Sequence, residues 1–333
     1  MTFAVAILNY NGSILLKKFI PELIKNCHHA KIYVIDNKST DSSLSSLSKF
    51  SDKINVIKLP FNYGYAKGYN EGVKQIKEDV IVFLNNDAVF LENKSFNEIY
   101  KIFNRDDHIS IAQPRIINYN NVEKYEYAGA SGGYIDFFGY PFCRGRILNT
   151  IENSDKYQST REIFWASGSC FIIRKDIFNL LDGFDEDFFC HMEEIDLCWR
   201  LKNLNSKYKI ITIGKSKVYH IGGGTMNYGT YKKNYLNFRN SYMMLIKNLP
   251  KKYFFVSIFF RTLIDFFIFL ISLITFRFKI AFPIISAYYY NLINLRNNIK
   301  KRNGIETNFK YFYTKSILVN YYFFAKKIFS TIK

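Results

Sequence analysis

Several features that mark common protein classes are missing from this sequence. Its five cysteines are odd in number and form no C-x-x-C pair, so a zinc site is not expected. No signal peptide precedes the first apolar segment, which starts at Thr2, and we therefore expect reduced thiols in a cytosolic compartment. No G-x-G-x-x-G follows that segment, which argues against a dinucleotide-binding protein.

Acidic residues are scarce at the C-terminal end, where positive charge is concentrated. The net charge is +18, and residues 247–333 contain 15 Lys and Arg but only two acids, Asp265 and Glu306. This asymmetry predicts a polyanionic partner for the tail, either nucleic acid or an anionic membrane surface. Aromatic and apolar residues stand between the charges, which favours the membrane and argues against nucleic acid as the partner.

Apolar segments alternate with segments of helical periodicity over the first 85 residues. Strands are predicted at 2–8, 31–35, 54–59 and 80–84, with helices between them. Such alternation with short loops predicts an α/β fold, with a mostly parallel, Rossmann-like central sheet flanked by helices. After it, residues 118–160 are rich in Gly, Tyr and Asn and predict a mobile loop or irregular hairpin that covers a site.

Polar residues follow two of these strands directly. Asn85, Asn86 and Asp87 end the fourth strand, where open α/β sheets bind ligands. One carboxylate and two amides suit a hard cation that carries phosphates, although a polar turn explains the same residues. Asp36 ends the second strand and is either a turn residue or a partner for a base or ribose.

Three carboxylates, Glu193, Glu194 and Asp196, stand just before an apolar helical face. The helix dipole favours acids in a first turn by about 0.3–1 kcal/mol each, which accounts for one or two of them but does not require three. Further along, His220 ends the last predicted strand and precedes the glycine-rich residues 222–225. A single histidine is more often structural, but this position also makes it a candidate ligand.

Five stretches together resemble the family 2 inverting glycosyltransferases of GT-A fold, in particular the bacterial rhamnosyltransferase-like branch. They are residues 8–12, 36–41, 62–72, 84–87 and 166–220. The resemblance covers about residues 1–250, which implies a nucleotide-sugar glycosyltransferase domain there. Residues 251–333 are then expected to form a basic, aromatic-rich helical tail that associates with a membrane.

The resemblance also implies roles for individual residues. Asp87 falls on the last position of the D-x-D-type metal motif, and His220 falls where some members have a further metal ligand. Glu194 falls on the position of the catalytic base, with Glu193 and Asp196 as alternatives. Residues that fall on the nucleotide-sugar site are Asn9, Asp36, Asn62, Lys67 and Asn86, and those expected to contact the acceptor are Trp165, Gly168 and His191.

The implied reaction is inverting transfer of a sugar, with rhamnose as one candidate, from a nucleotide-diphosphate donor. The expected acceptor is a hydroxyl of a glycan or polyprenyl-linked sugar in cell-surface polysaccharide synthesis, and the expected cofactor is Mg²⁺ or Mn²⁺. The expected location is the cytoplasmic face of a bacterial cell membrane, as a peripheral or monotopic protein.

Residues 254–276 are the most apolar stretch, interrupted by Arg261 and Asp265. A spanning helix needs about 20 largely uncharged residues, and only 11 separate Asp265 from Arg277. We therefore expect an interfacial or re-entrant helix on an anionic leaflet, with a spanning helix and a buried bundle as alternatives.

Two other functions compete with sugar transfer. A nucleotidyltransferase also uses an α/β fold and acidic metal sites, but residues 9–13 lack the Gly-rich basic loop that it normally has. A non-enzymatic nucleic-acid-binding protein would explain the net charge but not the apolar aromatic tail.

Overall fold

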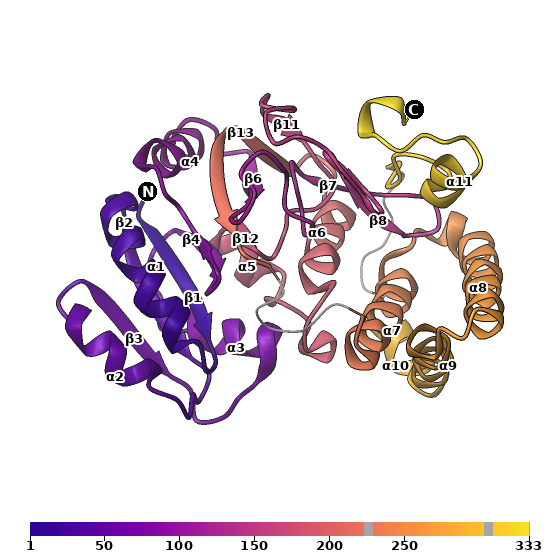
Figure 1. The fold of residues 1–333 in the computed structure, drawn as a ribbon, viewed down its shortest axis with the longest axis horizontal. Helices are drawn as coiled ribbons and strands as arrows, with labels where there is room; N and C mark the ends of the chain where they lie inside the picture. Colours follow the sequence, from indigo (N-terminus) through magenta and orange to yellow (C-terminus); the bar gives the residue numbers. More distant parts are fainter. Residues whose placement is uncertain (223–228, 303–308, 333) are drawn as a thin grey trace.

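Uniformly apolar segments form the strands of a nine-stranded central sheet in the computed structural model, which describes residues 1–222, 229–302 and 309–332 (Figure 1). Four parallel strands come from the first 85 residues: β1 (Phe3–Asn9), β2 (Ala30–Asp36), β3 (Ile54–Lys58) and β4 (Val80–Asn85). The sheet continues from β4 through β12 (Cys170–Arg174), β6 (Ile109–Asn118) and β13 (Lys209–His220) to β11 (Arg161–Glu162), and β5 (Ala88–Val89) pairs with the end of β13. Since β6 and β13 run in the same direction as β1 to β4, the predicted mostly parallel α/β sheet is confirmed.

Helices cover both faces of this sheet, each burying its apolar side against one of two core clusters. One face carries α1 (Ser13–Asn26), α2 (Ser43–Leu47) with the 3₁₀ turn Ser48–Phe50, and α4 (Asn93–Arg105). The other carries α3 (Gly64–Val73), α5 (Lys175–Leu180), the 3₁₀ turn η2 (Glu186–Phe188) and α6 (Glu193–Leu204). A strand buried on both faces leaves only its end open to ligands.

Residues 118–160 are more regular than the sequence predicts. They contain a second, antiparallel sheet of four short strands: β7 (Gly133–Ile135), β8 (Pro141–Cys143), β9 (Arg146–Ile147) and β10 (Thr150–Ile151). The glycines serve packing, since a Cβ on Gly133 would lie 1.9 Å from the ring of Trp165. Composition alone did not reveal this, because glycine marks a close approach as readily as a loop.

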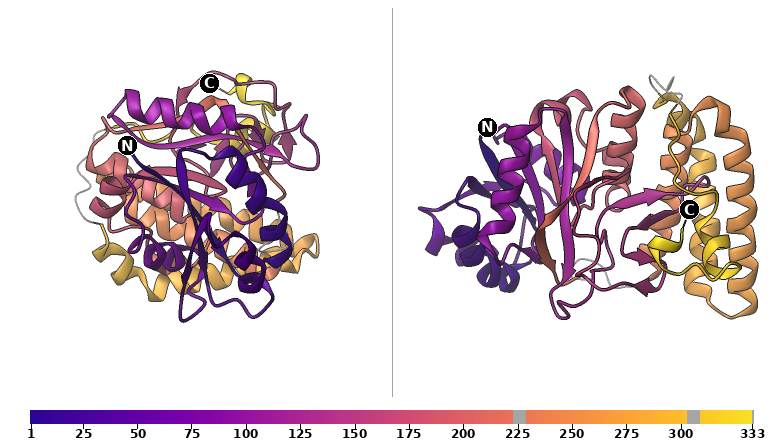
Figure 2. Two further views of the ribbon diagram at one scale, coloured as in Figure 1. Left: turned by 90° about the vertical axis from the view of Figure 1, so that its left-hand side faces the viewer. Right: turned by 90° about the horizontal axis from the view of Figure 1, so that it is seen from above.

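Helices after residue 230 pack against one side of the α/β body (Figure 2). They are α7 (Tyr231–Asn248), α8 (Lys251–Ile274), α9 (Phe278–Ile293), α10 (Leu295–Lys300) and α11 (Ile317–Tyr322), followed by the 3₁₀ turn Phe329–Thr331. α7 lies between the α/β body and the other helices (Figure 1). The last segment returns to the small sheet, where the Phe329 amide donates to the carboxylate of Glu152 at 2.9 Å.

Arg261 and Asp265 do not interrupt α8. The helix has 24 residues and contains an 18-residue segment with a mean hydropathy of 2.2, so by length and composition alone it is long enough to cross a membrane. Asp265 accepts from Arg261 Nε at 2.9 Å and from the hydroxyls of Tyr140 and Tyr288 at 2.5 and 2.8 Å. Both charges are about 1% exposed, so the ion pair faces the protein and the opposite side of α8 stays apolar.

Candidate active site

Polar side chains meet where β1, β2 and β4 end. Parallel pairing places Asn9 opposite Asp36 and Leu8 opposite Asn85. The amide nitrogen of Asn9 lies 3.5 Å from Asp36 Oδ1, and Asn86 Nδ2 donates to Asn9 Oδ1 at 3.1 Å. The structure therefore brings three of the predicted donor-site residues into one hydrogen-bonded row.

Asn62 and Lys67 border this row from the loop that leads into α3. Asn62 Oδ1 accepts from Asn37 Nδ2 at 3.0 Å, so the buried amide of Asn37 fixes the loop beside Asp36. Lys67 lies further out, with its ammonium 3.1 Å from Glu186. Asn37 escaped the sequence analysis because nothing distinguished it from its neighbours in the turn.

Asp87 and His220 are in direct contact, although 133 positions separate them in the sequence. Asp87 Oδ1 lies 2.9 Å from His220 Nε2, and on the other side of the ring Glu126 Oε2 lies 3.2 Å from Nδ1. All three side chains are buried. Burial alone would lower the pKa of His220, but the hydrogen bonds to the two carboxylates outweigh it and raise the pKa to about 10.

Glu126 is a residue of this site that sequence reasoning missed. It lies in the poorly patterned region before the small sheet, where the Ile117–Tyr125 bridge holds the chain beside β6. A carboxylate on the far nitrogen of a metal-binding histidine is a recurring arrangement, since it fixes the ring and leaves the other nitrogen facing the metal. Within the described residues no group of three or more His, Cys, Asp or Glu side chains could hold a metal ion, and residues 223–225 of the predicted glycine-rich segment lie outside them.

Glu193 and Glu194 begin α6, next to the loop that precedes β12. A Cβ built on Gly168 of that loop would lie 3.6 Å from Glu194 Oε1 and 3.0 Å from the hydroxyl of Tyr65. Each glutamate has a buried carboxylate oxygen without a hydrogen-bond partner. Burial raises the pKa of Glu194, and burial together with the charge of Glu194 raises that of Glu193 well above its ordinary value.

The same loop connects these glutamates to the histidine site. Gly168 lies beside Glu194, and the next residue, Ser169, places its hydroxyl 3.4 Å from His220 Nδ1. The carbonyl of Ser169 also accepts from the Asn85 amide at 3.1 Å. Glu194, His220 and the end of β4 therefore belong to one continuous site.

Asp196 lies deeper and is held by other residues. Its carboxylate accepts from Lys247 at 2.9 Å, Arg200 at 2.8 Å and Asn248 at 2.7 Å. Burial raises its pKa, but the charges of Lys247 and Arg200 prevail and keep the pKa below its ordinary value. These contacts join α6 to α7 and account for the burial of Asp196 without a catalytic role.

The loop before α6 has unusual backbone geometry. Phe189, His191 and Met192 have positive φ angles of 62°, 72° and 72°, a conformation that side chains disfavour. Asn240 of α7 holds this loop by donating to the carbonyls of Phe188, Cys190 and His191 at 3.0, 2.8 and 2.7 Å. α7 thus fixes the segment that positions the two glutamates.

Two of the residues predicted to contact the acceptor differ in their surroundings. Nε2 of His191 is buried without a hydrogen-bond partner, and burial, with the nearby charge of Lys233, lowers the pKa of His191 to about 4. Trp165 is 6% exposed and donates from its indole to the carbonyl of Tyr134 at 2.9 Å. The packing of Trp165 is explained by the core, and its contact with an acceptor stays a prediction.

The model of the family described as glycosyl transferase family 2 matches residues 4–181, from the second residue of β1 to the residue after α5. The chain belongs to this family. It is therefore a glycosyltransferase, which decides against the nucleotidyltransferase and the non-enzymatic alternatives. The resemblance read from the five sequence stretches is confirmed at the level of the family and its enzyme class.

Three relatives extend the likeness beyond the family model. The low-salt glycan biosynthesis hexosyltransferase Agl10 of Haloferax volcanii is 25% identical over 253 residues, covering 72% of this chain and 74% of that protein. Rhamnosyltransferase WbbL of Escherichia coli is 25% identical, covering 59% and 75%. The N-acetylglucosaminyl-diphospho-decaprenol L-rhamnosyltransferase of Mycobacterium tuberculosis is 24% identical, covering 59% and 69%.

Solved structures share the fold at low identity. GalNAc-T7, solved with UDP, GalNAc and Mn²⁺, has a TM-score of 0.60 at 17% identity, covering 76% of this chain and 49% of that one, so this chain spans about half its length. The mannosyltransferase PcManGT of Pyrobaculum calidifontis, in complex with GDP-Man and Mn²⁺, has a TM-score of 0.51 at 11% identity, covering 88% and 75%. The likeness establishes the GT-A fold.

Proposed function

We propose that this glycosyltransferase moves a sugar, with inversion, from a nucleotide-diphosphate donor to a hydroxyl of a lipid-linked or polysaccharide glycan. One observation carries the proposal. Glu194, a carboxylate with a raised pKa, is joined through Gly168 and Ser169 to the Asp87–His220 pair at the end of β4. A base and a diphosphate-binding pair in one site are what this reaction needs.

Asn9, Asp36 and Asn86 form the donor side of the proposed site. Their row of amides and a carboxylate can accept from a base or ribose and donate to diphosphate oxygens. Asn62 and Lys67 would lie at the edge of the donor site. The Lys67 ammonium can approach a phosphate by separating from Glu186, its exposed ion-pair partner. An exposed ion pair of this kind contributes little to stability, so replacing the contact with Glu186 by one with phosphate costs little free energy.

Glu194 is the proposed general base. Its carboxylate takes the proton of the acceptor hydroxyl as the oxygen attacks the anomeric carbon, while the bond from that carbon to the diphosphate oxygen breaks. Such proton transfer typically contributes about 10²–10⁴-fold in rate. Direct attack inverts the anomeric centre and needs no carboxylate nucleophile.

A divalent cation, Mg²⁺ or Mn²⁺, fits the residues present. Asp87 and His220 would offer one oxygen and one nitrogen ligand, with the cation in place of the proton between His220 Nε2 and Asp87, and Glu126 would orient the imidazole through Nδ1. When bound, the cation would neutralise the charge of the leaving diphosphate. Both structural neighbours were solved with Mn²⁺, which supports this assignment.

The described surface of α8 supports attachment to a membrane at the cytoplasmic face of the cell. The outward side chains of α8 are apolar, and they include Phe255, Phe259 and Phe267 at 81%, 60% and 59% exposure. Lysines 251 and 252 at its start suit an anionic surface. We propose residues 1–250 as the transferase part and residues 251–333 as the membrane-associating part. The decaprenol in the name of the mycobacterial relative supports a lipid-linked acceptor.

A donor panel tests the proposed function. The full chain in phosphatidylglycerol vesicles is given UDP-, GDP- and dTDP-sugars with polyprenyl-diphosphate-linked sugars, and nucleotide release is measured with Mn²⁺, with Mg²⁺ and with EDTA. We expect one donor class to be consumed in an acceptor- and cation-dependent manner. If every donor stays intact with folded protein across the acceptors, the proposal is wrong.

A further inference from the structure

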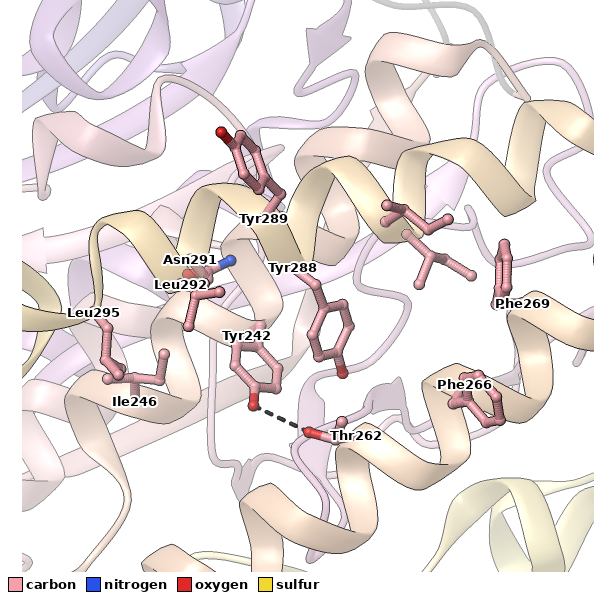
Figure 3. Close-up of a pocket in the computed structure, with 12 residues that line it drawn as sticks. Tyr242, Ile246, Thr262, Phe266, Phe269, Tyr288, Tyr289, Asn291, Leu292 and Leu295 are labelled. Carbon is pink, nitrogen blue, oxygen red and sulfur yellow. Dashed lines mark hydrogen bonds between the residues drawn. The ribbon is translucent and has the colours of Figure 1, made fainter.

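A cavity of about 540 Å³ lies between α7, α8 and α9, outside the site built from the strand ends (Figure 3). Its size is within the range of small-molecule sites, about 300–1,000 Å³. Aliphatic and aromatic side chains form most of its wall, among them Ile246, Phe266, Phe269, Ile284, Leu292 and Leu295.

Four polar side chains of this wall, those of Tyr242, Thr262, Tyr288 and Asn291, already have hydrogen-bond partners. The hydroxyls of Tyr242 and Thr262 bond to each other at 3.0 Å, as Figure 3 shows. Tyr288 donates to Asp265 at 2.8 Å, and Asn291 donates to the carbonyl of Arg239 at 3.0 Å. An occupant therefore needs no hydrogen-bonding groups, and a hydrocarbon satisfies the wall best.

The cavity opens on the apolar surface of the helices. Phe266, Tyr289 and Leu292 line it and are 51%, 66% and 70% exposed. Phe266 at this opening is itself an exposed residue of α8, next to Phe267 on the helix proposed to face the membrane. A hydrocarbon chain can thus enter from the bilayer without crossing water.

α7 connects the cavity to the active site. Tyr242 and Ile246 of this helix line the cavity, while Asn240 holds the loop before Glu193 and Glu194. A smaller hollow of about 350 Å³ shares Tyr289 with the cavity and reaches Tyr231, the first residue of α7. Next to Tyr231, the Lys232 ammonium lies 5.5 Å from the ring centre of Phe189 in that same loop.

We propose that the cavity between α7, α8 and α9 binds the isoprenoid chain of the lipid-linked acceptor. The chain lies in the larger cavity, and its diphosphate-linked sugar extends past Tyr289 and Lys232 toward Glu194. An isoprenoid chain bound in the cavity would place its diphosphate-linked sugar beside the loop before Glu194. A phospholipid in the same cavity would bring no acceptor sugar to that loop. The inference rests on the proposed function, because it locates part of the acceptor of that reaction.

Photolabelling tests the assignment directly. The full chain in phosphatidylglycerol vesicles is irradiated with a diazirine analogue of farnesyl diphosphate, and labelled peptides are mapped by mass spectrometry. We expect label on the cavity-lining turns of α7, α8 and α9, removed by unlabelled farnesyl diphosphate but not by inorganic diphosphate. Label spread over the outer face of α8, or displaced equally by extra phosphatidylglycerol, would mean an unspecific lipid surface and would overturn the proposal.

A matched pair of variants adds a second measurement. Leu292→Trp fills the mouth of the cavity, and Ile271→Trp places the same ring on α8 outside it, at a residue that is 61% exposed. Each methylene kept out of an apolar site costs about fourfold in affinity, so loss of two should reduce specific labelling about fifteenfold in L292W. I271W should label like the parent chain. Equal labelling of the two variants contradicts the proposal.

Folding and function are controlled separately. If L292W fails to unfold cooperatively, Ile285→Trp replaces it, since Ile285 lines the same wall and is 50% exposed. Nucleotide release from the donor panel is measured in parallel. Specific labelling without donor turnover would contradict the proposed function and support the isoprenoid site. Donor turnover without specific labelling would support the proposed function and contradict the isoprenoid site.

Discussion

The α/β body and α8 distribute polar and apolar residues in opposite ways. In the body, β4 is apolar and fully buried from Val80 to Leu84. In α8 the buried residues are all polar, namely Ser257, Arg261, Asp265 and Ser272, while five of its seven phenylalanines are exposed. One rule explains both, since apolar groups avoid water, and the exposed apolar face of α8 is the surface that we propose to lie against a membrane.

α7 joins these two regions and shows why they have to act together. Lys247 of α7 bonds Asp196 at the start of α6, and Asn240 holds the loop before Glu193. On its other side α7 contacts α9 through the Asn291–Arg239 hydrogen bond. The proposed membrane-associating helices and the loop before the proposed base therefore contact the same helix.

The largest effect should come from the polar site of the body. Glu194→Gln keeps the shape of the side chain but removes the base, so transfer should fall about 10²–10⁴-fold while donor binding is retained. Initial rates and donor titration measure the two quantities. Glu193→Gln is the matched variant, and a larger loss there than in E194Q would move the base to Glu193.

The pH profile of the parent chain sharpens that result. Burial raises the pKa of Glu194, and the base acts in its deprotonated form, so kcat/KM should fall as the pH is lowered through this raised pKa. This decrease of kcat/KM at low pH should be absent from the residual activity of E194Q. An unchanged acidic limb in E194Q would assign it to another group.

The polar interior of α8 should be the next most sensitive feature. Asp265→Ala leaves Arg261 buried without its partner, which typically costs about 3–5 kcal/mol. Thermal unfolding in detergent should show a marked decrease in Tm for D265A. The double variant Arg261→Met, Asp265→Leu should recover most of it, and no recovery would mean that the ion pair itself is required.

Glu126 should have an intermediate effect. Removing a carboxylate that orients a metal-binding histidine typically lowers metal affinity or activity about 10–100-fold. Mn²⁺ binding to Glu126→Gln, followed by electron paramagnetic resonance, measures this. Glu123→Gln, three positions earlier and exposed, is the control that should bind like the parent. Equal affinities in both variants would remove Glu126 from the site.

The smallest effect should come from the outer face of α8. Phe267→Glu should lower partition into phosphatidylglycerol vesicles about tenfold or more, because an exposed ring that would enter the bilayer is replaced by a carboxylate. Leu204→Glu, at a residue of the body that is 52% exposed, should partition like the parent. If both variants pellet equally with vesicles, the outer face of α8 is not the membrane contact.

Local patterns allowed the sequence to predict the strands, the polar strand ends and the helix that starts at Glu193. The Asp87–His220 contact followed from the family resemblance, and the parallel sheet brings its two halves together. Glu126, Asn37 and Asn240 could not be predicted, because each acts through tertiary contacts that no local pattern marks. The four-residue spacing of Arg261 and Asp265 is compatible with a pair on one face of a helix, and the structure shows that ion pair. The sequence does not show that the pair is buried against the rest of the protein, because the contacts with Tyr140 and Tyr288 are tertiary.

The anomeric configuration of the product tests the central claim most directly. Once the donor panel has identified the sugar nucleotide, the linkage formed by the full chain is determined by nuclear magnetic resonance. A configuration opposite to that of the donor, formed by the parent and lost in E194Q, is the predicted result. A product that retains the configuration of the donor would contradict direct attack assisted by Glu194.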